Sequence, residues 1–390
     1  MTTSATSAPP VFLAALIERF DPSVFHSPRY TARIRLEVGS EGAWDAVVED
    51  GKAQLVEASS AEPDSRLMAD AATWRRIARD VRGGMAAYRQ GKLRVRANLH
   101  LGVGLLAATS SSREPGRMRF GSVDTRIGEL SYVEAGTGPP ILALHGLGGT
   151  KASFLPTLAD MAASHRVIAL DLPGFGESAK PIGAAYDARF MARSVIAAMD
   201  GLELDTAHLV GNSMGGRVAL EAGMRHADRV ERLVLLCPAV AWLRDRRYAA
   251  IVRLLRPELG LLQVTPRPVV EGLVRRLVPG ASDGWAAAGV DEFLRSYLTP
   301  RGRAAFYAAA RNIYLDEPDG DDGFWVRLSA LERDCLFVWG AHDGLVPAGF
   351  RRHVEERLPR AEHLVLPCGH VPQVEAPRQT HGAMLRFLGA

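Results

Sequence analysis

Six apolar runs of strand length recur in the C-terminal two thirds of the chain, and they constrain the fold more than any other feature. The runs are "PPILALHG" (139–146), "RVIALDLPG" (166–174), "TAHLVGN" (206–212), "RLVLLCPA" (232–239), "CLFVWGAHD" (335–343) and "HLVLPCGH" (363–370). Near-continuous apolar runs of this length are typical of central parallel strands that are buried on both faces. Helical stretches separate them, so the sequence predicts an α/β fold with a doubly wound, mostly parallel sheet. Ligands of such sheets bind at the carboxyl ends of the strands.

One connection between these runs is much longer than the others. Residues 241–330 follow the fourth run, and their segments "YAAIVRLLR", "VVEGLVRRLV" and "GRAAFYAAARNIYL" have helical periodicity. An insertion of this size is expected to form a helical cap, or lid, over the strand ends. The candidates for its lining are Trp242, Leu254, Leu255 and Leu262.

The first part of the chain has a different pattern. Four segments alternate apolar and polar residues as half-buried strands do: "ARIRLEV" (32–38), "AWDAVVEDG" (43–51), "KAQLVEAS" (52–59) and "GKLRVRANLHL" (91–101). A helix, interrupted at Gly83-Gly84, is expected before the last of them. We therefore predict a small α+β domain over residues 11–110, a linker over 111–120 and the α/β domain over 121–390.

Bulk properties limit the classes of protein to consider. A chain of 390 residues with 47% hydrophobic and 23% charged residues predicts a globular protein of two domains, and a net charge of +3 argues against nucleic-acid binding. Three cysteines within or beside apolar runs predict buried free thiols in a reducing compartment. The N-terminus makes a poor signal peptide and no run is long enough to span a membrane, so a cytoplasmic location is expected.

One stretch, between Arg75 and Arg96, is strongly basic. It holds eight basic residues against one acid. We expect a solvated face there, and the alternative is a weak contact with anionic lipid head groups or an acidic partner.

Ser213 lies in "GNSMGG", directly after an apolar run and before a plausible helix. A nucleophile presented between a strand and a helix sits in a strained turn, so the residues around it must lack bulky side chains. Gly211 and Gly215 meet that demand, and Gly216 would let the helix pack closely against the strand. Because glycine-rich turns capped by serine are also common, this motif alone does not decide between a helix cap and a nucleophile.

A serine nucleophile needs a general base, and the base needs an acid that orients it. Asp343 and His370 each follow an apolar run, and 27 residues separate them, which is the length of one helix plus one strand. Both should therefore emerge at the same edge of the sheet as Ser213, in the chain order Ser, Asp, His. His342 should point away and His363 begins its strand at the opposite edge.

Asp171 also ends a strand, but it opens "DLPGFGES", where a structural role in a tight loop is the better interpretation. An oxyanion hole also requires two fixed N–H donors. We expect the Met214 amide, at the helix start, and the Leu147 amide, within "HGLGG", to supply them. A phosphate-binding loop is a poorer interpretation of these glycines, because the Lys-Ser/Thr pair of a P-loop does not follow them.

Taken in order, "HGLGG", "DLPGFGES", "GNSMGG", "GAHDGLVP" and "CGHVPQVEAP" resemble the motifs of the α/β-hydrolases over residues ~118–390. The resemblance implies Ser213 as nucleophile, His370 as base and Asp343 as acid, with Leu147 and Met214 as oxyanion donors. Glu375 and Pro377 match the family's structural residues after the histidine. Ser213 stands where dehalogenases and epoxide hydrolases of this fold carry Asp, which argues against those two activities.

Two parts of the sequence bear on the substrate. "HGLGGTKASF" with "GNSMGG" is similar to monoacylglycerol-lipase-like and lipase-type esterases, and "GNSMGG" also recurs in hydrolases that cleave carbon–carbon bonds of ring-fission products. Residues 11–110 resemble a sterol carrier protein-type lipid-binding domain through "SRLMADAATWRRIA" and "GKLRVRANLHL", although Ala97 replaces the glycine usual in that family. That resemblance implies an apolar tunnel for acyl chains or sterols.

The sequence therefore predicts a serine hydrolase of carboxylic esters with apolar acyl groups, which acts through an acyl-enzyme. A small-molecule ester or lipid is the expected substrate, with a lipid ligand in the N-terminal domain and without a metal or organic cofactor. Two alternatives remain open: a carbon–carbon hydrolase of ring-fission diketones, and a lipid-binding protein without catalysis.

Overall fold

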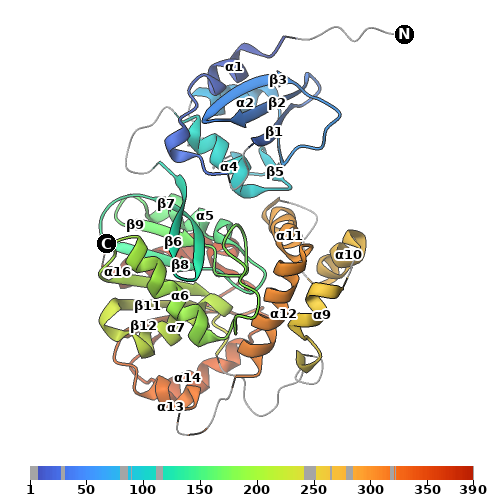
Figure 1. The fold of residues 1–390 in the computed structure, drawn as a ribbon. Coiled ribbons are helices and arrows are strands. Elements are labelled where there is room, and N and C mark those ends of the chain that lie inside the picture. Colours follow the sequence, from blue (N-terminus) through green and yellow to red (C-terminus); the bar gives the residue numbers. More distant parts are fainter. Residues whose placement is uncertain are drawn as a thin grey trace. The chain divides into compact units, whose positions relative to one another are not determined.

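The chain divides into two compact units in a computed structural model, and each is described here by itself (Figure 1). One unit comprises Met1–Gly121 with Pro268–Arg295, and the other Ser122–Arg267 with Ser296–Ala390. The structure describes residues 8–27, 31–79, 87–88, 90–110, 117–240, 252–263, 266–277, 284–316, 320 and 322–389. Gly83, Gly84, Trp242 and most of the predicted linker lie outside these ranges.

A five-stranded sheet forms the centre of the first unit, in the order β3-β2-β1-β4-β5. Its strands are β1 (Thr31–Val38), β2 (Gly42–Glu49), β3 (Lys52–Glu57), β4 (Ser65–Ala69) and β5 (Arg94–Arg96). The first three form antiparallel hairpins, while β4 runs parallel to β1 and antiparallel to β5. The helices are α1 (Val11–Ile17), η1 (Pro22–Val24), α2 (Ala71–Arg79) and α4 (Leu99–Ala108). The same unit also contains α10 (Arg267–Leu277) and most of α11 (Gly284–Tyr297).

The alternating strand predicted over 91–101 is wrong in its second half. The strand ends at Arg96, because Ala97 has a φ of +70° and Asn98 begins a helix. The Asn98 side chain accepts a hydrogen bond from the Leu101 N–H at 3.0 Å, as an N-cap does. All ten residues of the helix that follows, α4, are buried.

The second unit is built on an eight-stranded sheet, in the order β13-β12-β11-β10-β8-β9-β7-β6. Its strands are β6 (Arg119–Thr125), β7 (Gly128–Ala135), β8 (Pro140–Leu144), β9 (Arg166–Leu170), β10 (Ala207–Asn212), β11 (Val230–Leu236), β12 (Asp334–Gly340) and β13 (Glu362–Leu366). The strands from β8 to β13 pair in parallel, and β7 is antiparallel to β9. The predicted doubly wound, mostly parallel sheet is confirmed, and each of the six apolar runs forms one of its strands.

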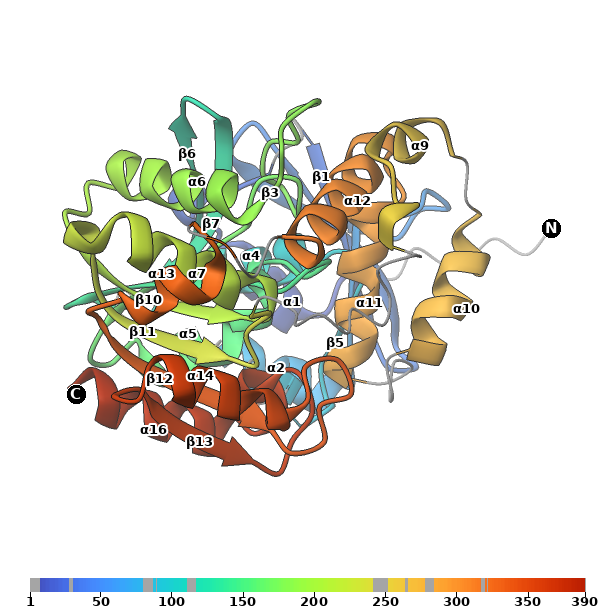
Figure 2. The ribbon, with the colours of Figure 1, turned by 90° about the horizontal axis from the view of Figure 1, so that it is seen from below.

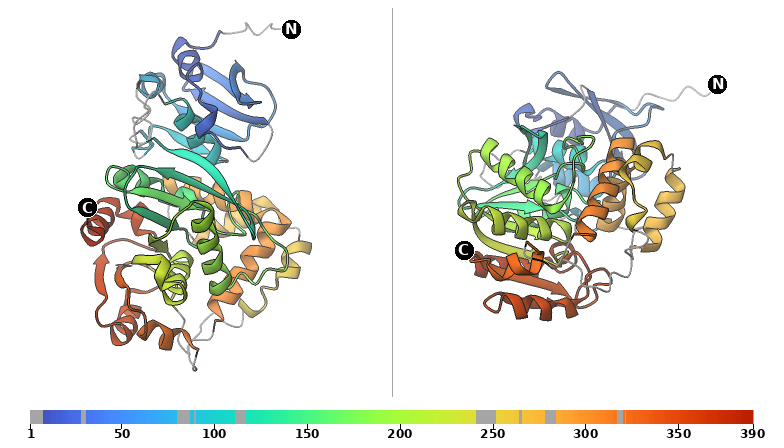
Figure 3. Two further views of the ribbon diagram at one scale, coloured as in Figure 1. Left: turned by 60° about the vertical axis from the view of Figure 1, so that its left-hand side comes forward. Right: turned by 60° about the horizontal axis from the view of Figure 1, so that its bottom comes forward.

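Helices cover both faces of this sheet (Figures 2 and 3). They are η2 (Lys151–Phe154), α5 (Leu155–Met161), α6 (Ala188–Gly201), α7 (Met214–Arg225), η3 (Ala227–Arg229), η4 (Ala348–Phe350), α14 (Arg351–Arg357), α15 (Pro372–Glu375) and α16 (Pro377–Leu388). In Figure 2, α6 and α7 lie on one face, with α5 and α16 on the other. The chain passes from β8 to β9 on one side and then to β10 on the other, so the topological switch point lies at the ends of β8 and β10.

The long connection after β11 carries further helices: α9 (Pro257–Leu262), α10, α11, α12 (Pro300–Tyr314) and α13 (Phe324–Ser329). Within the second unit, α9 packs on α12, and the Arg303 guanidinium of α12 donates to the Gly260 carbonyl at 2.9 Å. Two predicted lining residues, Leu254 and Leu262, are 71% and 79% exposed. Among the described residues, none of the helices combines the length and hydropathy required to cross a bilayer.

Candidate active site

Ser213 occupies a strained turn between β10 and α7. Its φ of +53° and ψ of −115° lie where residues with a side chain are rarely found. Backbone hydrogen bonds hold it there: the Ser213 N–H donates to the Leu236 carbonyl, and the Ser213 carbonyl accepts from the amides of Arg217 and Ala239. The turn therefore has the geometry of a nucleophile elbow.

The glycines around Ser213 are a steric requirement. A Cβ on Gly211 would lie 2.3 Å from the Gly215 carbonyl oxygen, and one on Gly215 would lie 2.0 Å from the Leu144 oxygen. Gly216 is also tight, since its Cβ would lie 2.8 Å from the Pro238 Cβ. The start of α7 can thus approach β8 and β10 only when these positions carry no side chain.

Asp343 and His370 meet at the carboxyl ends of β12 and β13. His370 Nδ1 lies 2.7 Å from Asp343 Oδ2. The other carboxylate oxygen, Oδ1, accepts from the Leu345 and Val346 amides at 2.8 and 2.9 Å. Burial of Asp343 opposes its ionisation, but the hydrogen bonds from His370 and the two amides outweigh it and hold the pKa of Asp343 below its usual value. The structure therefore brings together the predicted acid and base.

The side chains of Asn212 and Glu375 hold the backbone around His370. The Asn212 amide group donates to the His370 carbonyl and to the Leu236 carbonyl, both at 3.0 Å, and so ties the histidine loop to the end of β10. The Glu375 carboxylate accepts from the amides on either side of the histidine, those of Gly369 and Val371. Glu375 thus has the structural role expected of it.

The "HGLGG" loop lies directly beside Ser213. A Cβ on Gly146 would lie 3.2 Å from the Ser213 Cβ, and a tight turn follows, in which the Gly149 N–H donates to the Gly146 carbonyl. His145 at the base of the loop is fully buried, and burial lowers its pKa, so its ring is neutral. Leu147, at the tip, is exposed. Met214, the other predicted donor, is the first residue of α7.

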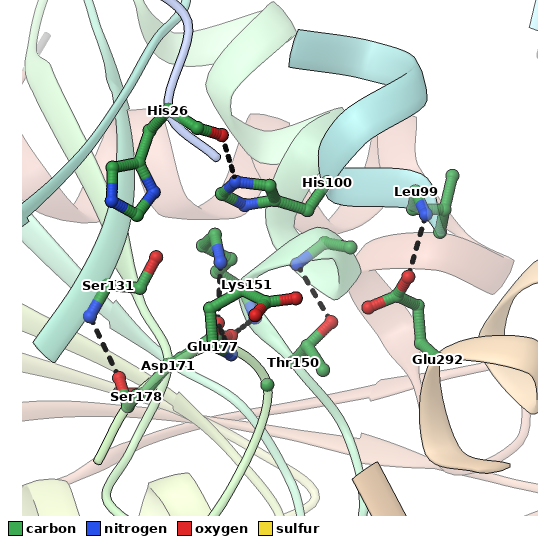
Figure 4. A network of polar contacts seen from close by, with 12 residues as sticks. His26, Leu99, His100, Ser131, Thr150, Lys151, Asp171, Glu177, Ser178 and Glu292 are labelled. Carbon is green, nitrogen blue, oxygen red and sulfur yellow. Dashed lines mark hydrogen bonds and ion pairs between the residues drawn. The ribbon is translucent and has the colours of Figure 1, made fainter. Parts of the chain in front are cut away.

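A buried ion pair anchors the segment that directly follows this loop (Figure 4). Lys151 Nζ lies 2.5 Å from Asp171 Oδ2, and the Lys151 N–H donates to Asp171 Oδ1 at 2.7 Å. The Glu177 N–H adds a third bond to this carboxylate. Burial opposes the ionisation of Asp171, but the Lys151 ammonium outweighs it and holds the pKa of Asp171 well below its usual value. Asp171 therefore holds a loop, as interpreted from the sequence, and Lys151 is a partner that the sequence analysis missed.

The competing histidines are placed elsewhere. His363 lies in β13, where its Nδ1 accepts from the Trp339 indole N–H at 3.0 Å. His342 is exposed beside Asp343. A buried thiol, that of Cys237 at the end of β11, is a closer neighbour: its sulfur and ligand atoms of Asp343 and His370 all lie within 4.8 Å of one another. Burial raises the pKa of Cys237, so the thiol is a neutral neighbour of the acid.

The serine after the central strand is strained, an Asp–His pair lies at the same sheet edge, and a glycine loop faces the serine. Together these features define a hydrolase of the α/β class. The family model for the α/β-hydrolase fold matches residues 139–377. The chain belongs to this family.

Several known proteins are similar to this chain. The dihydrolipoyllysine-residue acetyltransferase component of the acetoin cleaving system of Pseudomonas putida is 34% identical over 260 residues, which span 64% of this chain and 64% of that relative. A 2-hydroxymuconate semialdehyde hydrolase of Pseudomonas sp. (strain CF600) is 29% identical and covers 62% of this chain and 84% of its own length. Among solved structures, a bacterial membrane phospholipase A has a TM-score of 0.54 and 27% identity, covering 70% of this chain and 86% of its own.

Proposed function

We propose that this protein is a serine hydrolase that cleaves carboxylic esters with an apolar acyl group. The observation that carries the proposal is the hydrogen bond between His370 and Asp343, at the sheet edge where the strained Ser213 follows β10. This combination supplies a nucleophile, a base and an acid that orients the base.

The reaction proceeds in two stages. Ser213 Oγ attacks the ester carbonyl while His370 Nε2 accepts its proton, and the same nitrogen then protonates the leaving alcohol. Water, activated by His370, hydrolyses the acyl-enzyme and releases the acid. Asp343 accepts the hydrogen bond from Nδ1, so it fixes the ring and stabilises its charged form.

The negative charge that develops on the carbonyl oxygen needs donors fixed in advance. We assign them to the backbone N–H groups of Met214 and Leu147. Loss of one such donor typically raises the barrier by about 3 kcal/mol. The ion pair of Lys151 with Asp171 supports this assignment, because it anchors the segment that follows the "HGLGG" loop.

Three observations support an apolar acyl group. The cap, which we assign to residues 241–330, presents exposed leucines such as Leu254 and Leu262. A solved structure similar to this chain is that of a membrane phospholipase A. The N-terminal sequence resembles a sterol carrier protein-type domain, and its mostly apolar helix α4 is buried along its whole length. We assign residues 11–110 to that domain, with a lipid ligand, and the hydrolase to 121–390 after a linker over 111–120.

We also propose a reducing, cytoplasmic location. The three cysteines, Cys237, Cys335 and Cys368, are all free and buried. Proteins of oxidising compartments more commonly pair their cysteines in disulfides.

A carbon–carbon hydrolase is the second candidate, and one observation favours it: a relative that is 29% identical is a 2-hydroxymuconate semialdehyde hydrolase. The two candidates differ in substrate. A vinylogous diketone of the ring-fission type, assayed beside p-nitrophenyl esters of graded chain length, separates them by the ratio of kcat/KM.

The test of the first candidate is Ser213→Ala. The variant should lose turnover of p-nitrophenyl esters and covalent labelling by a fluorophosphonate, while its circular dichroism and melting temperature stay close to those of the wild type. Ser164→Ala, which changes an exposed serine, is the matched control and should keep both activities. Undiminished turnover by Ser213→Ala would refute the proposal, and a wild-type protein that is folded but unlabelled and carries lipid would favour the non-catalytic alternative.

A further inference from the structure

We propose that the N-terminal domain positions the cap through a polar latch between the start of α4 and the cap helix α11. The latch consists of Arg96, Ala97 and Leu99 on one side and Asp291 and Glu292 on the other. All five residues belong to the same compact unit. The proposal rests on the proposed function, because it assigns the N-terminal domain a part in admitting substrate to the hydrolase.

Four hydrogen bonds make up the latch. The Arg96 guanidinium donates from Nε and Nη2 to the two oxygens of Asp291, at 2.6 and 3.1 Å. The Ala97 N–H donates to the same carboxylate at 2.9 Å. The Leu99 N–H donates to Glu292 at 2.7 Å (Figure 4). A two-pronged arginine–carboxylate pair fixes orientation as well as distance, so these contacts define how α11 is held.

Local backbone structure explains why the donors point to one place. Ala97 has a φ of +70°, which ends β5, and α4 begins two residues later. The first amides of a helix have no partner within the helix, and the Leu99 N–H is one of them. The Glu292 carboxylate satisfies this amide and also accepts from the Arg295 guanidinium at 2.8 Å. A residue of the cap thus completes the start of an N-terminal-domain helix.

Burial shows that the contact is part of the fold. Asp291 and Glu292 are only 4% and 3% exposed. Burial of a carboxylate is unfavourable unless charge or hydrogen bonds compensate it. Here Arg96 and the two amides of the N-terminal domain contribute to that compensation, together with Arg295 of α11. If α11 were released from this domain, two adjacent carboxylates would become exposed to water. The released and held states therefore differ in the solvent exposure of these two groups.

The chain itself connects the latch to the hydrolase unit. The helix α11 ends at Tyr297, and α12 begins at Pro300 after a turn capped by Thr299. Within the hydrolase unit, Ala305 of α12 belongs to the same apolar cluster as Met214, the proposed oxyanion donor. Only two residues, 298 and 299, join the two helices along the chain.

The experiment compares Arg96→Met with Arg66→Met in the full-length protein. Arg66 is paired with Arg96 in register across β4 and β5, and it bonds only to Glu37 and Glu62 among the described side chains, so it is a matched control. Arg96→Lys keeps the charge without the two-pronged geometry. The readouts are hydrogen–deuterium exchange of α11 and the kinetics of ester hydrolysis as a function of acyl length.

In Arg96→Met, exchange in α11 should rise by about tenfold or more, while exchange in β1 and β2 stays unchanged, since loss of a charged hydrogen bond of this kind shifts an equilibrium by about that factor. KM for medium-chain esters should rise by roughly fivefold or more with a smaller change in kcat, because the catalytic groups are untouched. Arg96→Lys should lie between Arg96→Met and the wild type.

Equal exchange in α11 and equal KM for Arg96→Met and Arg66→Met would overturn the latch. Exchange that rises throughout the N-terminal sheet would also overturn it, since Arg96 would then stabilise its own domain rather than position the cap. A wild type that does not turn over esters refutes the proposed function separately, and the exchange measurement on α11 still decides whether the latch exists.

Discussion

Replacement of Lys151 by Met tests how much of the hydrolase unit depends on one buried ion pair. The side chains of Lys151 and Asp171 are 3% and 0% exposed, and Met preserves most of the volume of lysine without the charge. Removal of one partner of a buried pair typically costs about 3–5 kcal/mol, because the remaining charge is left uncompensated. For a domain of this size we expect the melting temperature to fall by roughly 6–20 °C.

The pH dependence of this loss has a definite sign. In the wild type the pKa of Asp171 lies below its ordinary value of 3.8, so its stabilising effect is present above that pH and is lost only in stronger acid. In Lys151→Met, burial acts on the carboxyl without the ammonium and raises its pKa. The deficit in the free energy of unfolding should therefore be largest near pH 7 and shrink as the pH falls toward 4.

Urea denaturation followed by tryptophan fluorescence at several pH values measures these effects. Lys151→Met combined with Asp171→Asn should be more stable than Lys151→Met alone, since no buried charge remains. Arg351→Met is the control, because its pair with Glu355 is exposed on both sides and should contribute at most about 1 kcal/mol. A Lys151→Met protein as stable as Arg351→Met at pH 7 would refute the reasoning.

Four further predictions concern the elbow, the histidine loop and α11. Asp343→Asn should lower kcat for p-nitrophenyl esters by about 10⁴-fold with the fold retained, because the amide no longer selects the required tautomer of the histidine; a loss under tenfold would contradict this role. Asn212→Ala should reduce fluorophosphonate labelling by about tenfold or more, since it removes the side-chain hydrogen bonds to the Leu236 and His370 carbonyls; an unchanged labelling rate would show that the histidine loop does not depend on its hydrogen bond to Asn212. Gly215→Ala should fail to accumulate as folded protein, since the new Cβ would meet the Leu144 carbonyl. Gly289→Ala in α11, where nothing lies within 4 Å, should be neutral or raise stability by about 0.5–1 kcal/mol, as measured by thermal denaturation.

The strand ends could be predicted because each apolar run marks where one buried strand begins and ends. A run such as "CLFVWGAHD" must be buried along its length, so the first charged residue after it marks the edge of the sheet. That reasoning predicts Asp343 and His370 at the same sheet edge, and the structure joins them by one hydrogen bond.

The latch and the ion pair of Lys151 with Asp171 were not predicted from the sequence, for a physical reason. Asp291 and Glu292 lie in a segment with helical periodicity, where adjacent acids are usually solvated, and Arg96 ends a basic stretch that we expected to be a solvated face. Lys151 follows a glycine loop at a position where charge is normally exposed. In each case the partner is distant in sequence and is chosen by tertiary packing, which local patterns do not encode.

Because all three thiols are buried, their reaction with an alkylating agent reports local opening of the folded chain. Cys237 and Cys368 flank the end of β12 beside Asp343, whereas Cys335 lies near the start of the same strand. Burial raises the pKa of Cys368 to about 11 and that of Cys335 to about 12, so neither reacts readily from the folded state. Alkylation of each thiol therefore measures how often its own end of the strand is exposed, and mass spectrometry can time the two ends separately.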